Sequence, residues 1–244
     1  MPSPAATLFL LIAALPTAVM GGVVGFGTGV TMLPLVAWVI GVRASVPVLS
    51  LALLLGNASR AWFSRHELDW RVIVAYLAGA LPPTVFGSVL YASARVEWLS
   101  RLMGAFLLCA VPIRRRLERG PVRMRLGHFP LLGAATGFLS AVVAAIGPIN
   151  TPFFLGYGLR RGAYVGTEAV CAAGVHVVKI VVYGRYALVT LESGALGLAI
   201  GAVMMLGAFL GRRILDRISD RTFRVVVEGL VMVLGLLFLL LPPQ

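Results

Sequence analysis

Two apolar stretches of this chain, one in each half, are interrupted by glycine and proline. The first, residues 21–34, reads GGVVGFGTGVTMLP, and the second, residues 137–152, reads GFLSAVVAAIGPINTP. Both are apolar enough to enter a bilayer, where a broken backbone is tolerated only if protein or a polar cavity covers it. Paired breaks in two halves of a membrane protein indicate a binding site between the halves.

The composition is that of a membrane protein. Hydrophobic residues make up 59% of the chain and charged residues 12%, whereas a soluble chain carries about 25% charged residues. The mean hydropathy is +0.96. The first twenty residues have no basic start and run into further apolar sequence, so we expect a retained helix and no cleaved signal. Apolar windows long enough to span a bilayer lie at 46–62, 72–92, 129–146, 163–183, 188–210 and 225–241.

The two halves correspond to each other in order. Pro34 corresponds to Pro152, and after a one-residue gap Arg60 corresponds to Lys179. Such order is typical of an internally duplicated transporter. We therefore predict an all-α integral membrane protein with two homologous halves and broken Gly/Pro helices near their interface. Its parts are a first repeat at 1–113, a basic linker at 114–128 and a second repeat at 129–244.

The distribution of arginines along the chain favours one orientation in the membrane. With five crossings per half, some of them short or broken, breaks fall near 22, 43, 64–71, 93–101, 147, 160–161, 184–186 and 212–224. One side then collects fifteen arginines and the other four. The positive-inside rule places the linker and 212–224 in the cytoplasm and both termini outside, with the halves inverted relative to each other. Four crossings per half, with re-entrant Gly/Pro segments, is the alternative, although it places 212–224 outside.

Several classes of function have no support. The net charge of +12 would suggest nucleic acid in a soluble protein, but no basic face is interleaved with aromatic residues. Cys109 and Cys171 lie in apolar stretches without a Cys/His cluster, so neither a metal nor a cofactor is expected. No nucleophile elbow, P-loop or HExxH motif is present, and we therefore expect a protein that is not an enzyme.

The first break offers main-chain donors to a ligand. Gly25, Gly27 and Gly29 remove side chains, and Thr28 adds a hydroxyl. Glycine lets a ligand approach N–H groups closely, and a half-helix that begins here would present its positive dipole end to an anion. Tight helix packing through glycine is the alternative explanation.

The second break combines a helix interruption with polar side chains. Gly147 and Pro148 interrupt the helix, and Asn150 and Thr151 stand beside the interruption. Pro152 suits the start of the next helical piece. Asn150 and Thr151 are candidates for ligand binding, and capping of that piece is the alternative.

The matched cations, Arg60 and Lys179, lie within apolar segments, and Lys179 is the only lysine of the chain. Asn57 and His176 precede them by three residues and share their helical faces. Charges inside membrane spans indicate a pathway, here for a small anion, whereas snorkelling to the interface is the alternative. Glu168 is a candidate for proton coupling, or a partner of the neighbouring arginines or of Lys179.

The chain resembles the sulfite exporter TauE/SafE family, also called the toluene-sulfonate uptake family, over nearly its whole length. The motifs are Gly25, Gly27 and Gly29 with Pro34, then Gly147–Pro148 with Pro152, and then Gly166–Thr167. The second half departs from the pattern in having AlaIleGlyPro in place of the Gly-Gly run. The resemblance implies an inner-membrane permease for sulfite, sulfoacetate or other sulfonates.

We therefore expect a secondary transporter for small sulfur-containing anions that works by alternating access. An anion channel, a transporter of a small carboxylate and a membrane scaffold are the alternatives. Expected partners are the bilayer and a small anion, while a coupled proton and a homodimer are left open. The expected substrate-binding residues are Gly25, Gly27, Thr28, Gly29, Asn57, Arg60, Gly147, Asn150, Thr151, Thr167, His176 and Lys179, with Glu168 as the proton-coupling candidate.

Overall fold

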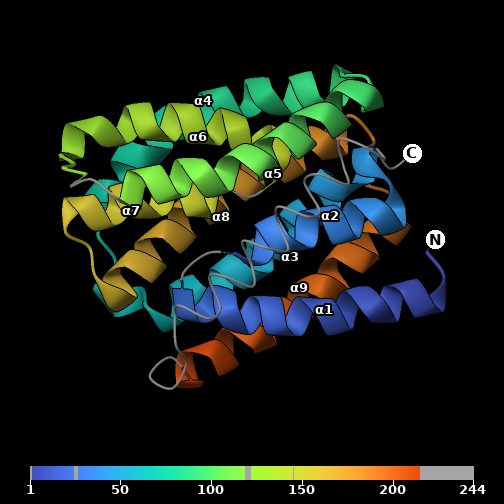
Figure 1. Cartoon of the computed structure of the whole chain (residues 1–244), viewed down its shortest axis with the longest axis horizontal. Coiled ribbons are helices and arrows are strands. Elements are labelled where there is room, and N and C mark those ends of the chain that lie inside the picture. The colour runs from blue at the N-terminus through green and yellow to red at the C-terminus, as the bar shows by residue number, and fades with distance from the viewer. Residues whose placement is uncertain (1, 25–26, 119–121, 145, 215–244) are drawn as a thin grey trace.

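The computed structural model describes residues 2–24, 27–118, 122–144 and 146–214, and its regular structure there is entirely helical (Figure 1). Two short 3-10 turns, η1 (Arg65–Glu67) and η2 (Leu126–His128), accompany nine α-helices in this part of the chain. The α-helices are α1 (Pro4–Val24), α2 (Thr28–Ile40), α3 (Val42–Phe63), α4 (Trp70–Ser93), α5 (Val96–Glu118), α6 (Phe129–Val143), α7 (Gly147–Tyr157), α8 (Arg161–Arg185) and α9 (Leu191–Ile214).

Helix ends lie close to every predicted break from residue 22 to residues 184–186. The predicted break at 212–224 and the segment after it lie largely outside the described residues. One local expectation is wrong: Pro152 lies inside α7, and Pro148 occupies the first turn. The helix starts one turn earlier than expected because Pro148, which needs no N–H partner, already suits that position.

Five helices in the described ranges are long and apolar enough to span a bilayer: α3, α4, α6 together with η2, α8 and α9. The ten predicted segments are therefore not all full spans. α2 has 13 residues and α7 has 11, which at about 1.5 Å per residue is well short of a hydrocarbon core of about 30 Å. Both short helices directly follow the glycine and proline breaks.

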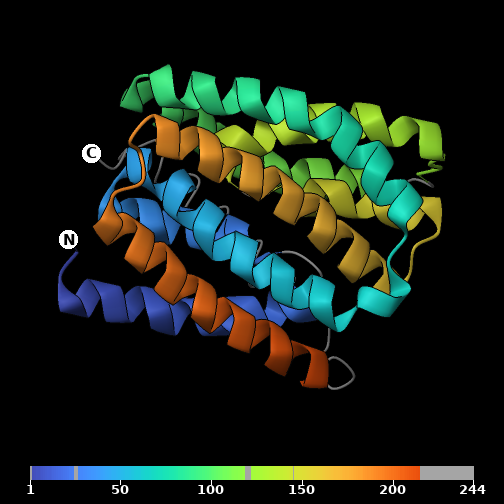
Figure 2. The same cartoon turned by 180° about the vertical axis from the view of Figure 1, so that it is seen from behind.

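The long helices form two layers. Seen from behind in Figure 2, α9, α3, α8 and α4 lie side by side, and each neighbouring pair is in contact. α1 packs against α9, and α6 packs against α4. These outer contacts are so close that they leave no room for a side chain at two glycines. A Cβ at Gly133 of α6 would overlap the Tyr76 carbonyl oxygen, and a Cβ at Gly211 of α9 would overlap the Val19 carbonyl oxygen. Small residues allow such close approach of membrane helices.

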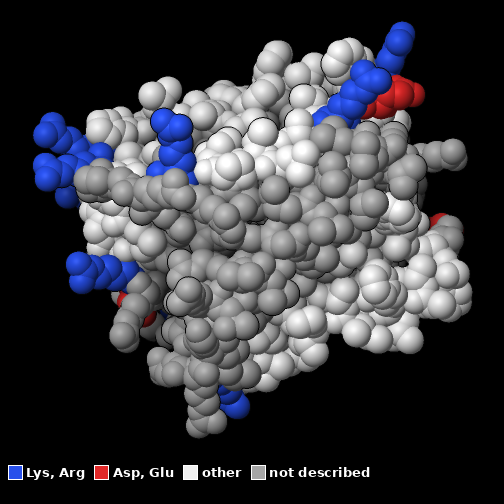
Figure 3. All heavy atoms as spheres, viewed as in Figure 1, with Lys and Arg blue, Asp and Glu red and all other residues white. Residues whose placement is uncertain are grey.

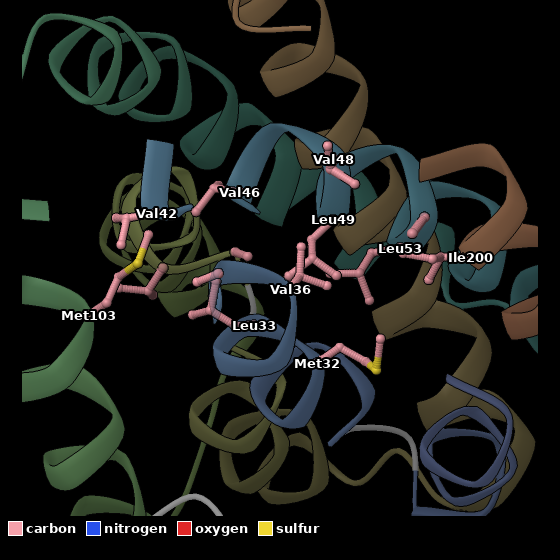
Figure 4. Close-up of a cluster of buried hydrophobic side chains, with 14 of the residues drawn as sticks. Met32, Leu33, Val36, Val42, Val46, Val48, Leu49, Leu53, Met103 and Ile200 are labelled. Carbon is pink, nitrogen blue, oxygen red and sulfur yellow. The ribbon is translucent and has the colours of Figure 1, made fainter. Parts of the chain in front are cut away.

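The short helix α2 is enclosed by the rest of the protein. Its buried side chains belong to one hydrophobic cluster with residues of α1, α3, α5 and α9, and Figure 4 shows Met32, Leu33 and Val36 among labelled residues of the last three helices. Most of its length is buried, including Pro34. A helix of this length can therefore sit at membrane depth because protein, not lipid, surrounds it.

Tryptophan and charge mark the two ends of the bundle. Trp62 and Trp70 flank the α3–α4 connection, and Trp38 and Trp98 lie at the end of α2 and the start of α5. All four are more than half exposed, as expected for interfacial anchors. Figure 3 shows the visible Lys and Arg side chains mainly toward the left and at the upper right, and the described surface between them is largely uncharged.

Candidate functional site

A cavity of about 50 Å³ lies among α2, α3, α4, α6, α7 and α8. The starts of both short helices line it: Gly27, Thr28 and Gly29 from the first break, and Ile146, Gly147 and Pro148 from the second. The two breaks, far apart in sequence, therefore meet at one place.

Neither short helix has a side-chain cap at its start. Gly27 precedes α2 with φ 111°, and Ile146 precedes α7. Glycine adopts such a positive φ readily, which explains why this residue type stands at the turn into α2. The first N–H groups of a helix have no partner within the helix, and the dipole places partial positive charge there. Two such ends facing one cavity favour a negatively charged occupant.

Arg60 and Glu168 bring opposite charges to the cavity from α3 and α8. The Arg60 Nη2 atom lies 3.6 Å from Glu168 Oε2, and the side chains are 14% and 4% exposed. Arg60 also donates hydrogen bonds to the Asn57 side-chain oxygen and, over 3.4 Å, to the Gly21 carbonyl. Arg60 therefore does not snorkel to the membrane surface. Glu168 pairs with Arg60, which is not among the partners considered from sequence, namely Arg160, Arg161 and Lys179.

Arg60 lines both the central cavity and a second one. A cavity of about 20 Å³ lies between α1, α2, α3 and α9, and it shares Arg60, Asn57, Thr28 and Leu53 with the central cavity. The Thr28 hydroxyl donates to the Thr17 carbonyl of α1 over 2.9 Å. Polar groups of α2 and α3 therefore stand between two small hollows.

Two residues that line the central cavity carry buried polar atoms without partners among the described residues. Asn150 of α7 donates from Nδ2 to the Tyr76 hydroxyl over 3.2 Å, and that hydroxyl is 2.8 Å from Thr136 Oγ1. The other amide atom, Asn150 Oδ1, and His176 Nδ1 have no hydrogen-bond partner among the described residues. Both side chains are buried, and such atoms are costly unless a ligand or water satisfies them.

Lys179 is buried beside the second break but does not line the cavity. Its Nζ donates to the Ser140 carbonyl over 2.8 Å and to the Ala144 carbonyl over 3.4 Å. These carbonyls lie at the C-terminal end of α6, where the dipole favours a cation. Lys179 therefore stabilises the end of an interrupted helix and does not reach the membrane surface.

The structure distributes the predicted site residues in two groups. Cavity-lining residues are Gly27, Thr28, Gly29, Asn57, Arg60, Gly147, Asn150, His176 and Glu168. The side chains of Thr151, Thr167 and Lys179 bind within the protein instead: Thr151 bonds to the Gly147 carbonyl and pairs with the Tyr164 hydroxyl, and Thr167 accepts from the Asp69 N–H. Gly25 lies outside the described residues.

Sequence reasoning missed Tyr76 and Ser140, which both line the cavity. Tyr76 is the residue that holds Asn150. Its signal was a hydroxyl in the interior of an apolar window, which a buried aromatic residue can carry without any ligand. Ser140 and Thr136 carry equally weak signals, because such residues are common in membrane helices.

This arrangement of long apolar helices around a small cavity that carries charged and polar side chains is that of a multi-pass helical membrane protein. The sequence matches the sulfite exporter TauE/SafE family over residues 10–238, and the chain belongs to this family. The resemblance seen in the motifs is thereby confirmed, and it makes the protein a membrane transporter by family. No curated protein and no solved structure matched the chain.

Proposed function

We propose that the chain is a secondary transporter that moves small sulfur oxyanions, sulfite in particular, across the inner membrane by alternating access. The observation that carries this proposal is the meeting of two uncapped helix starts with Arg60 at one cavity. Helix N-termini and a guanidinium are the groups that proteins use to bind oxyanions.

The cavity also supports a small substrate. At about 50 Å³ it has room for only a few water-sized groups, since one water needs at least ~10–15 Å³ by this measure. A sulfonate with a long organic tail would need the surrounding helices to separate. We therefore place sulfite ahead of larger organosulfonates.

The proposed substrate contacts include main-chain and side-chain groups from both halves. The N–H groups at Thr28, Gly29 and Gly147 would bind oxyanion oxygens, and Arg60 would neutralise charge. Asn150 and His176 would complete the shell with their amide and imidazole groups. The unpartnered Asn150 Oδ1 and His176 Nδ1 atoms support this assignment. Thr151, Thr167 and Lys179 would then act by positioning α7 and α8.

An inverted repeat would supply the two alternating states. We pair α1 with α6, α2 with α7, α3 with α8 and α4 with α9. Under this pairing, the α1–α9 contact corresponds to α6–α4, and α3–α9 corresponds to α8–α4, which supports a pseudo-two-fold relation. Transporters of this design rock one bundle against the other around a central site. Under the positive-inside rule, the arginine-rich linker at 114–128 would be cytoplasmic.

Ligand-induced thermal stabilisation tests the proposal on purified protein in detergent. Sulfite, sulfate, methanesulfonate, acetate and chloride are compared at equal ionic strength. A ligand at a hundredfold excess over its Kd stabilises by about 2.7 kcal/mol, so we expect a clear rise with sulfite and a smaller or absent rise with acetate. No stabilisation by any sulfur oxyanion would overturn the proposal, and a larger rise with acetate would favour a carboxylate carrier.

A further inference from the structure

We propose that Arg60 exchanges Glu168 for the transported anion, and that Glu168 takes up a proton in that exchange. Anion and proton would then move together. This inference rests on the proposed function, because it concerns the same cavity, but it adds how transport is driven. It also assigns separate roles to the two charged side chains.

The geometry places the two side chains in competition with an incoming anion. Glu168 and Arg60 both line the cavity, with their charged atoms 3.6 Å apart. Glu168 is the one acidic side chain in the described wall of that cavity, and its Oε2 atom has no hydrogen-bond partner there. An ion pair without such hydrogen bonds is weaker than a bidentate contact and separates more readily.

An anion cannot bind next to an ionised Glu168 without strong repulsion. Like charges a few ångströms apart disfavour each other far more in a buried site than in water. Protonation of the carboxylate removes this repulsion and releases the guanidinium. Binding of the anion to Arg60 therefore depends on binding of a proton to Glu168.

Neutral partners keep Arg60 in place during the exchange. The Asn57 side-chain oxygen and the Gly21 carbonyl both accept hydrogen bonds from its guanidinium. Neither partner carries a charge, so Arg60 can keep these contacts and still present its full charge to an anion. Asn57 lies one helical turn before Arg60, which fixes the side chain on the cavity side of α3.

Apart from Arg60, the other titratable side chains in the described wall of this cavity come from α4 and α8. Tyr76 of α4 and His176 of α8 line the same cavity, and Cys171 is buried one turn after Glu168. The described wall residues from α2, α6 and α7 carry no titratable side chain. Lys179, one turn beyond His176, points to the α6 carbonyls. Glu168 is the only carboxylate among these groups, and so it is the one whose protonation removes a negative charge.

The proposed cycle conserves charge and protons. In the empty site, ionised Glu168 pairs with Arg60. A proton from the open side binds the carboxylate and makes it a neutral acid, the ion pair separates, and the anion binds Arg60 and the helix starts. After the site opens to the other side, the anion leaves, the proton follows it, and the Arg60–Glu168 pair forms again.

Transport by proteoliposomes tests this cycle. Two assays use labelled sulfite: exchange at equal concentrations on both sides, and accumulation driven by an imposed pH gradient. Glu168→Gln carries a permanent neutral group in place of the protonated acid. We expect it to keep exchange but to lose gradient-driven accumulation, falling to the level of empty liposomes. Glu97→Gln, an exposed change in the first turn of α5, should behave as the wild type.

The outcomes separate this inference from the proposed function. Absence of exchange in the wild type would overturn the proposed function itself. Exchange in both proteins, with accumulation retained by Glu168→Gln, would overturn the coupling alone. A stably folded Glu168→Gln protein that has lost exchange would also overturn it, because the neutral form should suffice for binding.

A second measurement needs no variant. Binding heats of sulfite to wild-type protein are measured in buffers of different ionisation enthalpy, at a pH where sulfite is fully deprotonated. Any net proton uptake then belongs to the protein. Uptake on binding is expected, and binding without proton exchange would overturn the coupling.

Discussion

Arg60 of α3 and Lys179 of α8 each donate a hydrogen bond to a main-chain carbonyl near the end of an interrupted helix. Arg60 bonds to Gly21 of α1, and Lys179 bonds to Ser140 of α6. The two cations also occupy corresponding positions in the predicted repeat. Only Arg60, however, lines the cavity and pairs with an acid. Under the proposed repeat, the two cations share a structural role at a helix end, and we propose that Arg60 alone also binds the substrate.

Replacement of Lys179 should affect folding more than binding. Lys179→Met keeps the length of the side chain but leaves the α6 carbonyls without their cation. Hydrogen bonds to charged groups contribute about 1.5–3 kcal/mol, so we expect a loss of this order in the free energy of unfolding. Thermal unfolding measures it, with Arg185→Met at the exposed end of α8 as the control. Wild-type stability of Lys179→Met would contradict the structural role.

Loss of the Tyr76 hydroxyl should weaken anion binding through Asn150. Tyr76→Phe removes the acceptor that holds Asn150 Nδ2, and the loss of one hydrogen bond is about 0.5–1.5 kcal/mol. This corresponds to a rise in Kd of up to about tenfold. Sulfite titration monitored by thermal stability gives the Kd. Tyr157→Phe, on the same α7 helix as Asn150, is the matched control, and equal effects of both changes would count against the positioning role.

Filling the cavity should block binding without removing any polar group. Ala172 lines the cavity on α8, and Ala172→Leu adds three carbon atoms to a space of about 50 Å³. Stabilisation by sulfite should disappear while the protein stays folded. Val177→Leu on the exposed side of the same helix serves as the control. Unchanged sulfite binding in Ala172→Leu would mean that the anion binds elsewhere.

The close α4–α6 contact should tolerate no side chain at Gly133. A Cβ there would overlap the Tyr76 carbonyl oxygen, so Gly133→Ala should separate the helices and reduce stability by about 1–3 kcal/mol, the usual cost of overpacking. Gly184→Ala is the matched control, because nothing lies within 4 Å of its added carbon. The apparent melting temperature compares them, and equal values would refute the packing argument.

The sequence predicted the helical breaks well because glycine and proline act locally. Breaks at Gly27 and Gly147 follow from residue type and need no tertiary information. The predicted start of α7 was wrong by one turn because two prolines, Pro148 and Pro152, both suit a helix start. The absence of full spans at α2 and α7 depends on burial by other helices, which single-sequence periodicity does not report.

The candidate site was harder to predict than the fold. The Arg60–Glu168 pair joins helices from opposite halves, so it depends on how α3 packs against α8. The different surroundings of Arg60 and Lys179 likewise depend on which carbonyls and acids the fold brings near them. Tyr76 carried a weak signal because most buried tyrosines serve packing. Residue chemistry therefore suggested candidates, and packing decided which of them share a cavity.

Uptake of radiolabelled sulfite into proteoliposomes tests the central claim most directly. We compare the wild type, Arg60→Gln, Arg185→Gln and the double variant Arg60→Gln with Glu168→Gln, which leaves no unpaired carboxylate in the site. Saturable uptake in the wild type and in Arg185→Gln, with none above empty liposomes in either protein lacking Arg60, is the predicted result. Absence of wild-type uptake, or full uptake in the folded double variant, would contradict an anion site built on Arg60.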